Sequence, residues 1–268
     1  MLNKVKKVIR WNLKKVKGLM HNAKYSRNKN IGRMGGNMEI HGFQKTTLLD
    51  FPGHVAATVF VGGCNFRCPF CHNGLLVLDP GNQPLIGEDE VLAYLKKRRK
   101  ILEGVCITGG EPTLQKDLVS FIKKLKAMDY LVKLDTNGYC PGVLEELLTE
   151  GLLDYVAMDV KSSMERYNIV AGVPDIECEK ILESIRLLKN CDIPYEFRTT
   201  VVKGLHRIEE FEEIGRLLFG CPAYFLQSFR ESDNMTGEGY EAFSTQEMEE
   251  IANIAGKYID KVELRGVE

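Results

Sequence analysis

From residue 39 onward, short apolar runs alternate with segments in which apolar residues recur at helical spacing. A run of roughly four to eight apolar residues is typical of a buried strand, and a period of about 3.6 residues is typical of an amphipathic helix. The pattern predicts strands over 55–61, 104–108, 131–135, 155–159, 195–202 and 223–229, with 262–264 as a candidate for a last strand. It predicts helices over 88–100, 114–128, 141–150, 177–188, 208–218 and 245–258.

This alternation of strands and helices, with short connections, indicates an α/β fold. Strands that are each followed by a helix favour a parallel sheet with right-handed crossovers. About six parallel strands form either an open sheet or an incomplete barrel, and the pattern alone leaves both open. No repeat, low-complexity tract or linker divides residues 39–268, so we expect one domain there.

The first 38 residues differ from the rest in composition. They contain eleven Lys or Arg and no Asp or Glu, and apolar residues recur at helical spacing between Leu2 and Met20. Such a basic extension is a membrane- or partner-binding amphipathic helix, a disordered segment, or the product of a misplaced start codon. Our hypothesis is that the native chain begins at Met38. Detecting a tryptic peptide from residues 1–33 by mass spectrometry would contradict it.

The charge of the remaining chain argues against general binding of nucleic acid. Residues 39–268 carry 25 basic and 37 acidic residues, a net charge of −12, and phosphate backbones attract basic surfaces. No apolar run is long enough to cross a bilayer, and no charged-then-apolar secretory start is present. We therefore expect a cytoplasmic protein without stable membrane association. Its eight cysteines then favour reduced thiols and metal binding over a disulfide framework.

Three of these cysteines form a close-spaced motif directly after the first predicted strand. Cys64, Cys68 and Cys71 have the spacing C-x3-C-x2-C. Three thiolates on a four-iron cluster leave one iron without a protein ligand, and an open iron is a place for chemistry. A structural zinc site would need a fourth ligand, for which His72 is a candidate. The motif alone leaves both metals open.

Other polar and glycine-rich motifs follow the later predicted strands. Gly109-Gly110-Glu111-Pro112 follows the second, Asp135-Thr136-Asn137-Gly138 the third, and Asp159-Val160-Lys161 the fourth. Arg198 lies within the fifth predicted strand and Gln227 near the end of the sixth. Each motif alone is also explained by turn chemistry. Barrel-like α/β enzymes build their active sites at the carboxyl ends of strands, so their coincidence favours a metal enzyme.

Together these residues resemble a known family. The C-x3-C-x2-C loop with an aromatic residue before its last cysteine, followed by a Gly-Gly-Glu strand end, resembles the radical S-adenosylmethionine (SAM) superfamily. Cys71-His72-Asn73, Asp135-Thr136-Asn137-Gly138 and Asp159-x-Lys161 resemble the activating enzymes of glycyl radical enzymes. The stretch from Gln44 to Gly53 is most similar to the activase of anaerobic ribonucleoside-triphosphate reductase. The resemblance covers residues 39–268 and implies a partial (β/α)6 TIM-like barrel.

The resemblance implies a role for each motif. Cys64, Cys68 and Cys71 would hold a [4Fe-4S] cluster, whose fourth iron is chelated by the amino and carboxylate groups of SAM. Asp50 would lie near the entering glycine loop of a partner protein. The implied SAM-binding set is Gly109 and Gly110, which approach the methionine amino group, with Glu111 nearby; Asp135 and Lys161 at the ribose and carboxylate; and Asn137, Arg198 and Gln227 along the cleft. Asp135, Thr136 and Asp159 would enclose a monovalent cation.

The implied activity is the one-electron reduction of SAM to methionine and a 5′-deoxyadenosyl radical, which takes hydrogen from a glycine of anaerobic ribonucleotide reductase. The implied electron donor is a flavodoxin or a ferredoxin-type protein, and the enzyme would be sensitive to oxygen. Alternatives are the activase of another glycyl radical enzyme and a small-molecule radical enzyme such as 7-carboxy-7-deazaguanine synthase. A zinc-stabilised or electron-transfer protein is the alternative from another class. The turn-rich segment 231–240 either shapes the barrel mouth or is a solvated loop.

Overall fold

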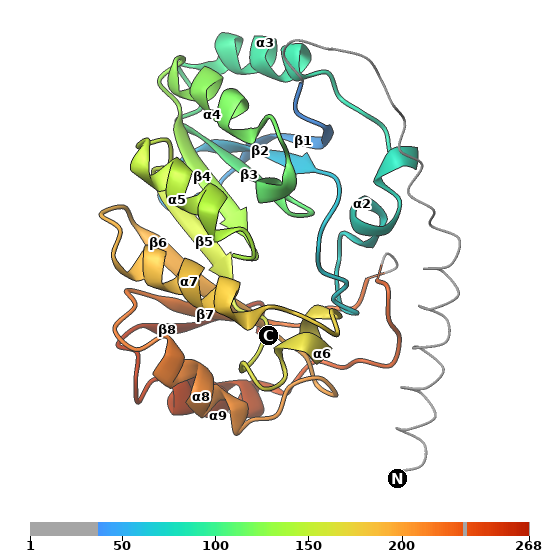
Figure 1. Cartoon of the computed structure of the whole chain (residues 1–268), viewed down its shortest axis with the longest axis vertical. Coiled ribbons are helices and arrows are strands. Elements are labelled where there is room, and N and C mark those ends of the chain that lie inside the picture. Colours follow the sequence, from blue (N-terminus) through green and yellow to red (C-terminus); the bar gives the residue numbers. More distant parts are fainter. Residues whose placement is uncertain (1–36, 233–234, 268) are drawn as a thin grey trace. The chain divides into compact units, whose positions relative to one another are not determined.

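A single curved sheet of eight strands organises the described part of the chain (Figure 1). The computed structural model describes residues 37–232 and 235–267. The strands lie in chain order and comprise β1 (Ile40–Thr47), β2 (Ala56–Val61), β3 (Gly104–Gly109), β4 (Leu131–Thr136), β5 (Tyr155–Asp159), β6 (Tyr195–Val201), β7 (Tyr224–Ser228) and β8 (Val262–Arg265). β1 pairs antiparallel with β2, and every later pair is parallel.

The sheet confirms the predicted fold class and extends it by two strands. All six predicted strands form, the candidate at 262–264 is β8, and β8 does not pair with β1, so the barrel is incomplete. The sheet thus has seven parallel strands rather than six. The antiparallel strand β1 was not predicted. Its sequence, IHGFQKTT, is polar and half-exposed because it lies at the edge of the sheet, where the usual apolar run is not needed.

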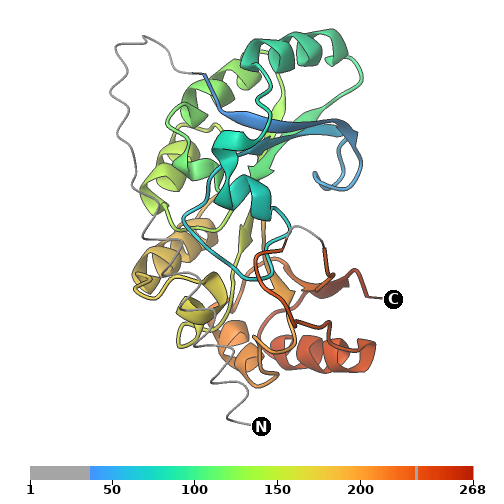
Figure 2. The same ribbon diagram turned by 90° about the vertical axis from the view of Figure 1, so that its right-hand side faces the viewer.

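The longer helices cover the outer face of the sheet, whereas α2 (Gly74–Leu78) lies apart from them, beside the ends of the strands (Figures 1 and 2). The other helices are α3 (Glu88–Arg98), α4 (Leu118–Lys126), α5 (Pro141–Thr149), α6 (Tyr167–Ala171), α7 (Cys178–Lys189), α8 (Glu210–Leu217) and α9 (Thr245–Ala255). Short 3₁₀ turns occupy Pro80–Asn82 and Pro112–Leu114. All six predicted helices form. The two short helices α2 and α6 were missed because five residues are too few to show a helical period.

One helix begins later than its apolar pattern predicts. The pattern extends from residue 114, but α4 begins at Leu118 because Pro112–Leu114 forms a separate 3₁₀ turn. The Glu111 side chain caps that turn by accepting a hydrogen bond from the Thr113 backbone N–H. The strand-end motif therefore sets the start of the helix. α4 then packs Leu118, Phe121, Ile122 and Leu125 against the sheet, as an amphipathic helix does.

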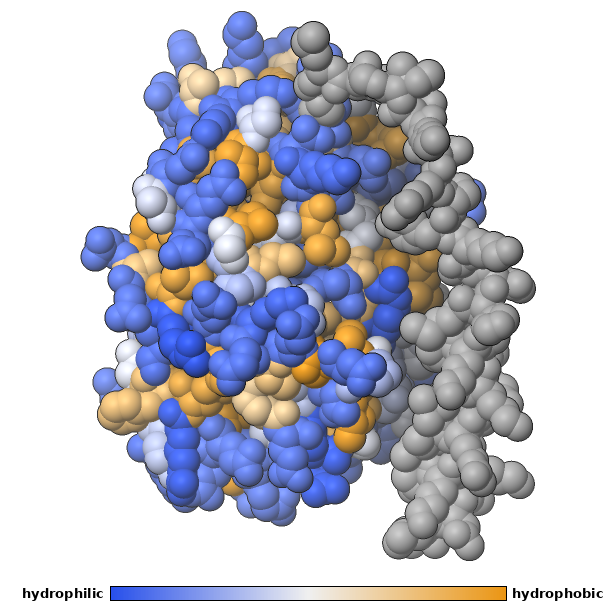
Figure 3. Space-filling view, viewed as in Figure 1, coloured by the Kyte–Doolittle hydropathy of each residue, from blue (hydrophilic) through white to orange (hydrophobic). Residues whose placement is uncertain are grey.

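The predicted division of the chain at residue 38 concerns a segment outside the described residues, so it stays a prediction. Within the described part, Met38 is buried, and its backbone N–H donates to Glu88 Oε2 at 2.7 Å. None of the described helices has the length and apolarity that crossing a bilayer demands. Figure 3 shows polar and apolar side chains interspersed over one face of the domain.

Candidate functional site

The carboxyl ends of the parallel strands surround a cavity of about 190 Å³. It is lined by nearly the whole predicted site: Cys64, Cys68, Cys71, Gly109, Gly110, Glu111, Asp135, Thr136, Asn137, Asp159, Lys161 and Arg198. Gln227 is the predicted site residue that does not line it; its Oε1 instead accepts a hydrogen bond of 3.5 Å from Thr200, which does. The sheet therefore brings together residues that lie more than a hundred positions apart in the sequence.

The two glycines at the end of β3 allow the backbone to approach the strand that leads into the cysteine loop. A Cβ atom on Gly110 would lie 1.9 Å from the Gly63 carbonyl oxygen, and Gly109 has a φ of +117°. In return, Gly110 N donates to Val61 O and Glu111 N to Gly63 O, both at 2.8 Å. Close contact with the neighbouring backbone is therefore sufficient to explain both glycines. The predicted contact with a methionine amino group remains a prediction.

Glu111 joins two of the strand-end motifs. Its carboxylate is fully buried and accepts hydrogen bonds from Thr113, from Thr136 Oγ1 at 2.7 Å and from the Asn137 backbone N–H at 2.7 Å. Burial raises the pKa of this carboxyl, and the hydrogen bonds from Thr113, Asn137 and Thr136 oppose that shift. Its structural role is thus to hold the loop after β3 against the loop after β4.

The cysteine loop is held on one side by α6. Arg67 N donates to the Ala171 carbonyl at 2.8 Å. The next residue, Gly172, has a φ of +68°, and a Cβ atom there would lie 2.1 Å from the Arg67 carbonyl oxygen. Only glycine fits this contact without displacing the loop between Cys64 and Cys68.

On its other side, the cysteine loop contacts the turn-rich segment after β7. Thr236 Oγ1 donates to Cys68 O at 3.1 Å, and Gly237 N donates to Pro69 O at 2.8 Å. The His72 ring donates through Nε2 to Arg230 O at 2.6 Å. Of the two interpretations left open by the sequence, these contacts favour a segment that shapes the site over a solvated loop.

The geometry disfavours the closed zinc site. His72 directs Nε2 to the Arg230 carbonyl, and no set of three His, Cys, Asp or Glu side chains in residues 37–232 and 235–267 is arranged around a single metal ion. The three cysteines line one cavity, and three thiolates are the donor set of a four-iron cluster with one open iron. Burial raises the pKa of the Cys64 thiol to about 12 and that of Cys68 to about 11. Cluster binding therefore has to displace protons from these thiols.

Charged side chains of alternating sign, mostly half-buried, connect β4, β5 and β6 at the cavity. Lys133 pairs with Asp135; Arg198 pairs with Asp135 at 3.2 Å and with Asp159 at 2.8 Å; Lys161 pairs with Asp159 at 3.0 Å. Burial alone would raise the pKa of both carboxyls, but the nearby cations lower it: Arg198 and Lys133 at Asp135, and Arg198 and Lys161 at Asp159. Both carboxylates are therefore ionised at neutral pH.

This ion-pair network bears on two sequence predictions. Each of the two carboxylates already faces two cationic side chains, so a monovalent cation there stays a prediction without support from the pairing. Lys133 was missed by the sequence analysis. The available signal was its position two residues before Asp135 in the same strand, which places both side chains on one face of the sheet. Asp50 lies outside the cavity lining and accepts a hydrogen bond of 2.5 Å from Thr58.

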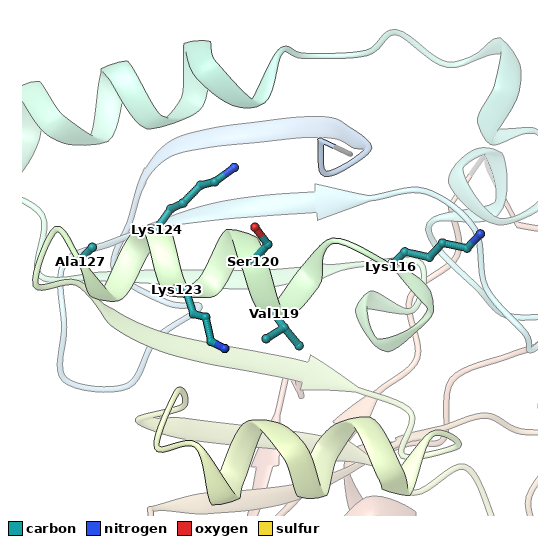
Figure 4. Close-up of a pocket in the computed structure, with 6 residues that line it drawn as sticks. All are labelled: Lys116, Val119, Ser120, Lys123, Lys124 and Ala127. Atoms are coloured by element: carbon teal, nitrogen blue, oxygen red, sulfur yellow. The ribbon is translucent and has the colours of Figure 1, made fainter. Parts of the chain in front are cut away.

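A second, shallow hollow lies along α4 and contains none of the predicted chemistry (Figure 4). It is lined by Lys116, Val119, Ser120, Lys123, Lys124 and Ala127. Lys123 and Lys124 pair with Glu150 and Glu88, at 2.7 and 2.5 Å. Because two of its three lysines are ion-paired and the hollow is open to solvent, the cavity at the strand ends remains the candidate site.

Comparisons with known proteins agree with this site. The Radical SAM superfamily profile matches residues 58–218. A Methanocaldococcus jannaschii protein provisionally named a glycyl-radical enzyme activating enzyme is 34% identical over 235 residues, which are 85% of this chain and 96% of the relative. A Saccharolobus solfataricus protein provisionally named GTP 3′,8-cyclase is 32% identical over 154 residues, covering 56% of this chain and 48% of the relative.

The fold is shared with solved structures of low sequence identity. Streptococcus suis SuiB bound to S-adenosylmethionine has a TM-score of 0.60 at 12% identity, with 78% of this chain and 52% of SuiB covered. The chain thus spans about half of SuiB, and that likeness concerns the fold alone. The profile match and the relative matched nearly end to end establish more: the chain belongs to the radical SAM superfamily and is a radical SAM enzyme.

Proposed function

We propose that this enzyme installs a glycyl radical on a partner protein, and that the partner is anaerobic ribonucleoside-triphosphate reductase. The observation that carries the proposal is one cavity lined both by three cysteines of a single loop and by ion-paired side chains of β4, β5 and β6. The relative matched over 96% of its length bears an activating-enzyme name, whereas the cyclase is matched over 48%. This difference in coverage favours the activase over a small-molecule radical enzyme.

Membership of the superfamily implies a [4Fe-4S] cluster and SAM as cofactors. When bound, the two groups would supply the chemistry of one-electron reductive cleavage of SAM. Cys64, Cys68 and Cys71 would hold the cluster, and three thiolates on four irons would leave one iron free for the cofactor. The side chains present therefore fit both groups.

The charged side chains give the cavity a defined polarity for SAM. Lys161 and Arg198 are cations held in place by Asp159 and Asp135, and they would bind the methionine carboxylate. The Asp135 and Asp159 carboxylates, both ionised, would accept hydrogen bonds from ribose hydroxyls or the amino group and would balance the sulfonium charge. Because the ion pairs already hold these four side chains in place, the side chains require little rearrangement when the cofactor binds.

The specific client and setting complete the proposal. The stretch from Gln44 to Gly53 supports a ribonucleotide reductase rather than another glycyl radical enzyme. A flavodoxin or a ferredoxin-type protein would donate the electron, and the enzyme would act in the cytoplasm under anaerobic conditions.

The test is direct formation of the product radical. The reconstituted, reduced chain would be incubated anaerobically with SAM and an anaerobic ribonucleotide reductase, and the sample frozen for electron paramagnetic resonance (EPR). We expect a glycyl radical signal that depends on both proteins. A signal from another glycyl radical enzyme but not from the reductase would reassign the client, and SAM cleavage without any protein radical would overturn the activase assignment.

A further inference from the structure

The sulfur of the first cysteine in the loop is flanked by N–H donors. The Phe66 backbone nitrogen lies 3.3 Å from Cys64 Sγ, and Asn137 Nδ2 lies 3.8 Å from it. Each of the two sulfurs also has an oxygen neighbour at 3.8 Å, which is Asn65 Oδ1 for Cys64 and the Ala171 carbonyl for Cys68. Both of these N–H contacts are made to Cys64. The donors are therefore concentrated at the Cys64 edge of the cavity.

The orientation of the Asn137 amide follows from its neighbours. Its Oδ1 accepts a hydrogen bond of 2.9 Å from the Tyr139 backbone N–H, which directs Nδ2 toward the cysteine loop. There, Nδ2 donates to Asn65 Oδ1 at 2.8 Å. The oxygen of Asn65 is thus fixed toward Asn137, and its own NH₂ group has to point elsewhere.

That NH₂ group finds no partner within residues 37–232 and 235–267. Asn65 Nδ2 is buried and makes no hydrogen bond among the described residues. Turning the Asn65 amide over would not help, because two NH₂ groups would then face each other across 2.8 Å. A buried donor without an acceptor costs free energy. Asn65 is not among the residues that line the cavity, but its Oδ1 lies 3.8 Å from Cys64 Sγ. A group held by the cysteines is therefore the nearest candidate for the missing acceptor.

We propose that Asn65 and Asn137 form a pair of amide donors to the sulfur atoms at the Cys64 edge of the cluster, and that they raise its reduction potential. In the reduction, one electron from an external low-potential donor enters the cluster, which passes from the 2+ to the 1+ state without any bond forming or breaking. N–H···S hydrogen bonds stabilise the more negative, reduced cluster more than the oxidised one. The proposal rests on the proposed function only in requiring the cluster.

The experiment is a redox titration of the full chain, three single serine variants and one double variant, followed by EPR of the reduced cluster without SAM. Asn65→Ser and Asn137→Ser shorten the side chain and remove each amide, and the serine hydroxyl can still serve Tyr139 N in the second case. Asn73→Ser is the matched control, because Asn73 lines the cavity as Asn137 does but its amide donates to Gly109 O at 2.9 Å. Iron and sulfide are determined for each protein.

At a fixed applied potential, we expect the ratio of reduced to oxidised cluster to fall about two- to tenfold for each donor removed. The double variant Asn65→Ser/Asn137→Ser should fall further than either single variant, and Asn73→Ser should match the wild type. Full cluster content with wild-type ratios in both single variants would overturn the proposal.

A second measurement covers variants that fail to assemble a full cluster. The Asn73→Ser protein would be labelled with ¹⁵N at the side-chain amides of asparagine, and hyperfine spectra recorded on its reduced cluster. We expect ¹⁵N couplings, and their absence would overturn the amide pair. A wild-type chain that assembles no cluster at all would instead refute the proposed function, so the two failures are distinguishable.

Discussion

Replacing Gly110 with alanine should destabilise the domain at the entrance to the cysteine loop. The added Cβ would lie 1.9 Å from Gly63 O and 2.7 Å from Gly63 C, and both are backbone atoms that cannot rotate away. The backbone segments at Gly110 and Gly63 must then move apart. This movement strains the loop and weakens the hydrogen bond of 2.8 Å from Glu111 N to Gly63 O. Overpacking costs about 1–3 kcal/mol and the lost hydrogen bond about 1 kcal/mol. We therefore expect a loss of about 2–4 kcal/mol.

Urea unfolding of the cluster-free full chain, followed by circular dichroism, measures this loss. Gly142→Ala is the matched control, because a Cβ at Gly142 meets nothing within 4 Å and the residue lies in α5. It should leave stability unchanged or raise it by up to about 1 kcal/mol. Equal stabilities for Gly110→Ala and the wild type would show that the approach of the two strand ends is not as close as described.

Three further predictions concern charge, pH and the segment after β7. Arg198→Met leaves two half-buried carboxylates with one cation fewer each, so we expect a loss of about 2–4 kcal/mol in urea unfolding, between the values for exposed and fully buried pairs; a loss below about 1 kcal/mol would show that the network is hydrated. Burial lowers the pKa of His206 from 6.5 to about 4, so the folded state holds this proton more weakly than the unfolded chain. Stability should therefore fall by about 3 kcal/mol as the pH drops through that interval, and His206→Gln should flatten the profile; an unchanged slope would contradict the assignment. Thr236→Val removes the hydrogen bond to Cys68 O, so oxygen should bleach the reconstituted cluster faster than in Thr236→Ser, which keeps the hydroxyl; equal bleaching rates would refute a protective role for this contact.

The sequence was sufficient for the parts of the fold that depend on apolar burial. Strands such as β2 and β3 are buried almost throughout, so their apolar runs identify them. The edge strand β1 has a half-exposed, polar pattern and gave no such signal. The number of parallel strands was uncertain by one because β8 is short and half-buried.

The site was predictable where residue type and strand position together limit the chemistry. The cysteines and the charged strand ends met at one cavity because parallel strands place their carboxyl ends on one edge. The roles of individual side chains were harder to predict from the sequence. Glu111 serves as a hydrogen-bond centre, and Lys133 completes the ion pairs; both depend on strand register and rotamer. The contacts of the segment around Thr236 depend on the path of a loop that the local sequence does not specify.

The central claim is that the cavity bounded by the three cysteines cleaves SAM reductively. The most direct measurement is the 5′-deoxyadenosine formed by the full chain after anaerobic reconstitution with iron and sulfide and reduction with dithionite. Three proteins would be compared: the wild type, Cys68→Ala, and Cys178→Ala, whose thiol lies in α7 outside the cavity. We predict product from the wild type and Cys178→Ala and none from Cys68→Ala. A wild-type chain that carries the cluster but forms no product, or a Cys68→Ala protein that still forms it, would contradict the account.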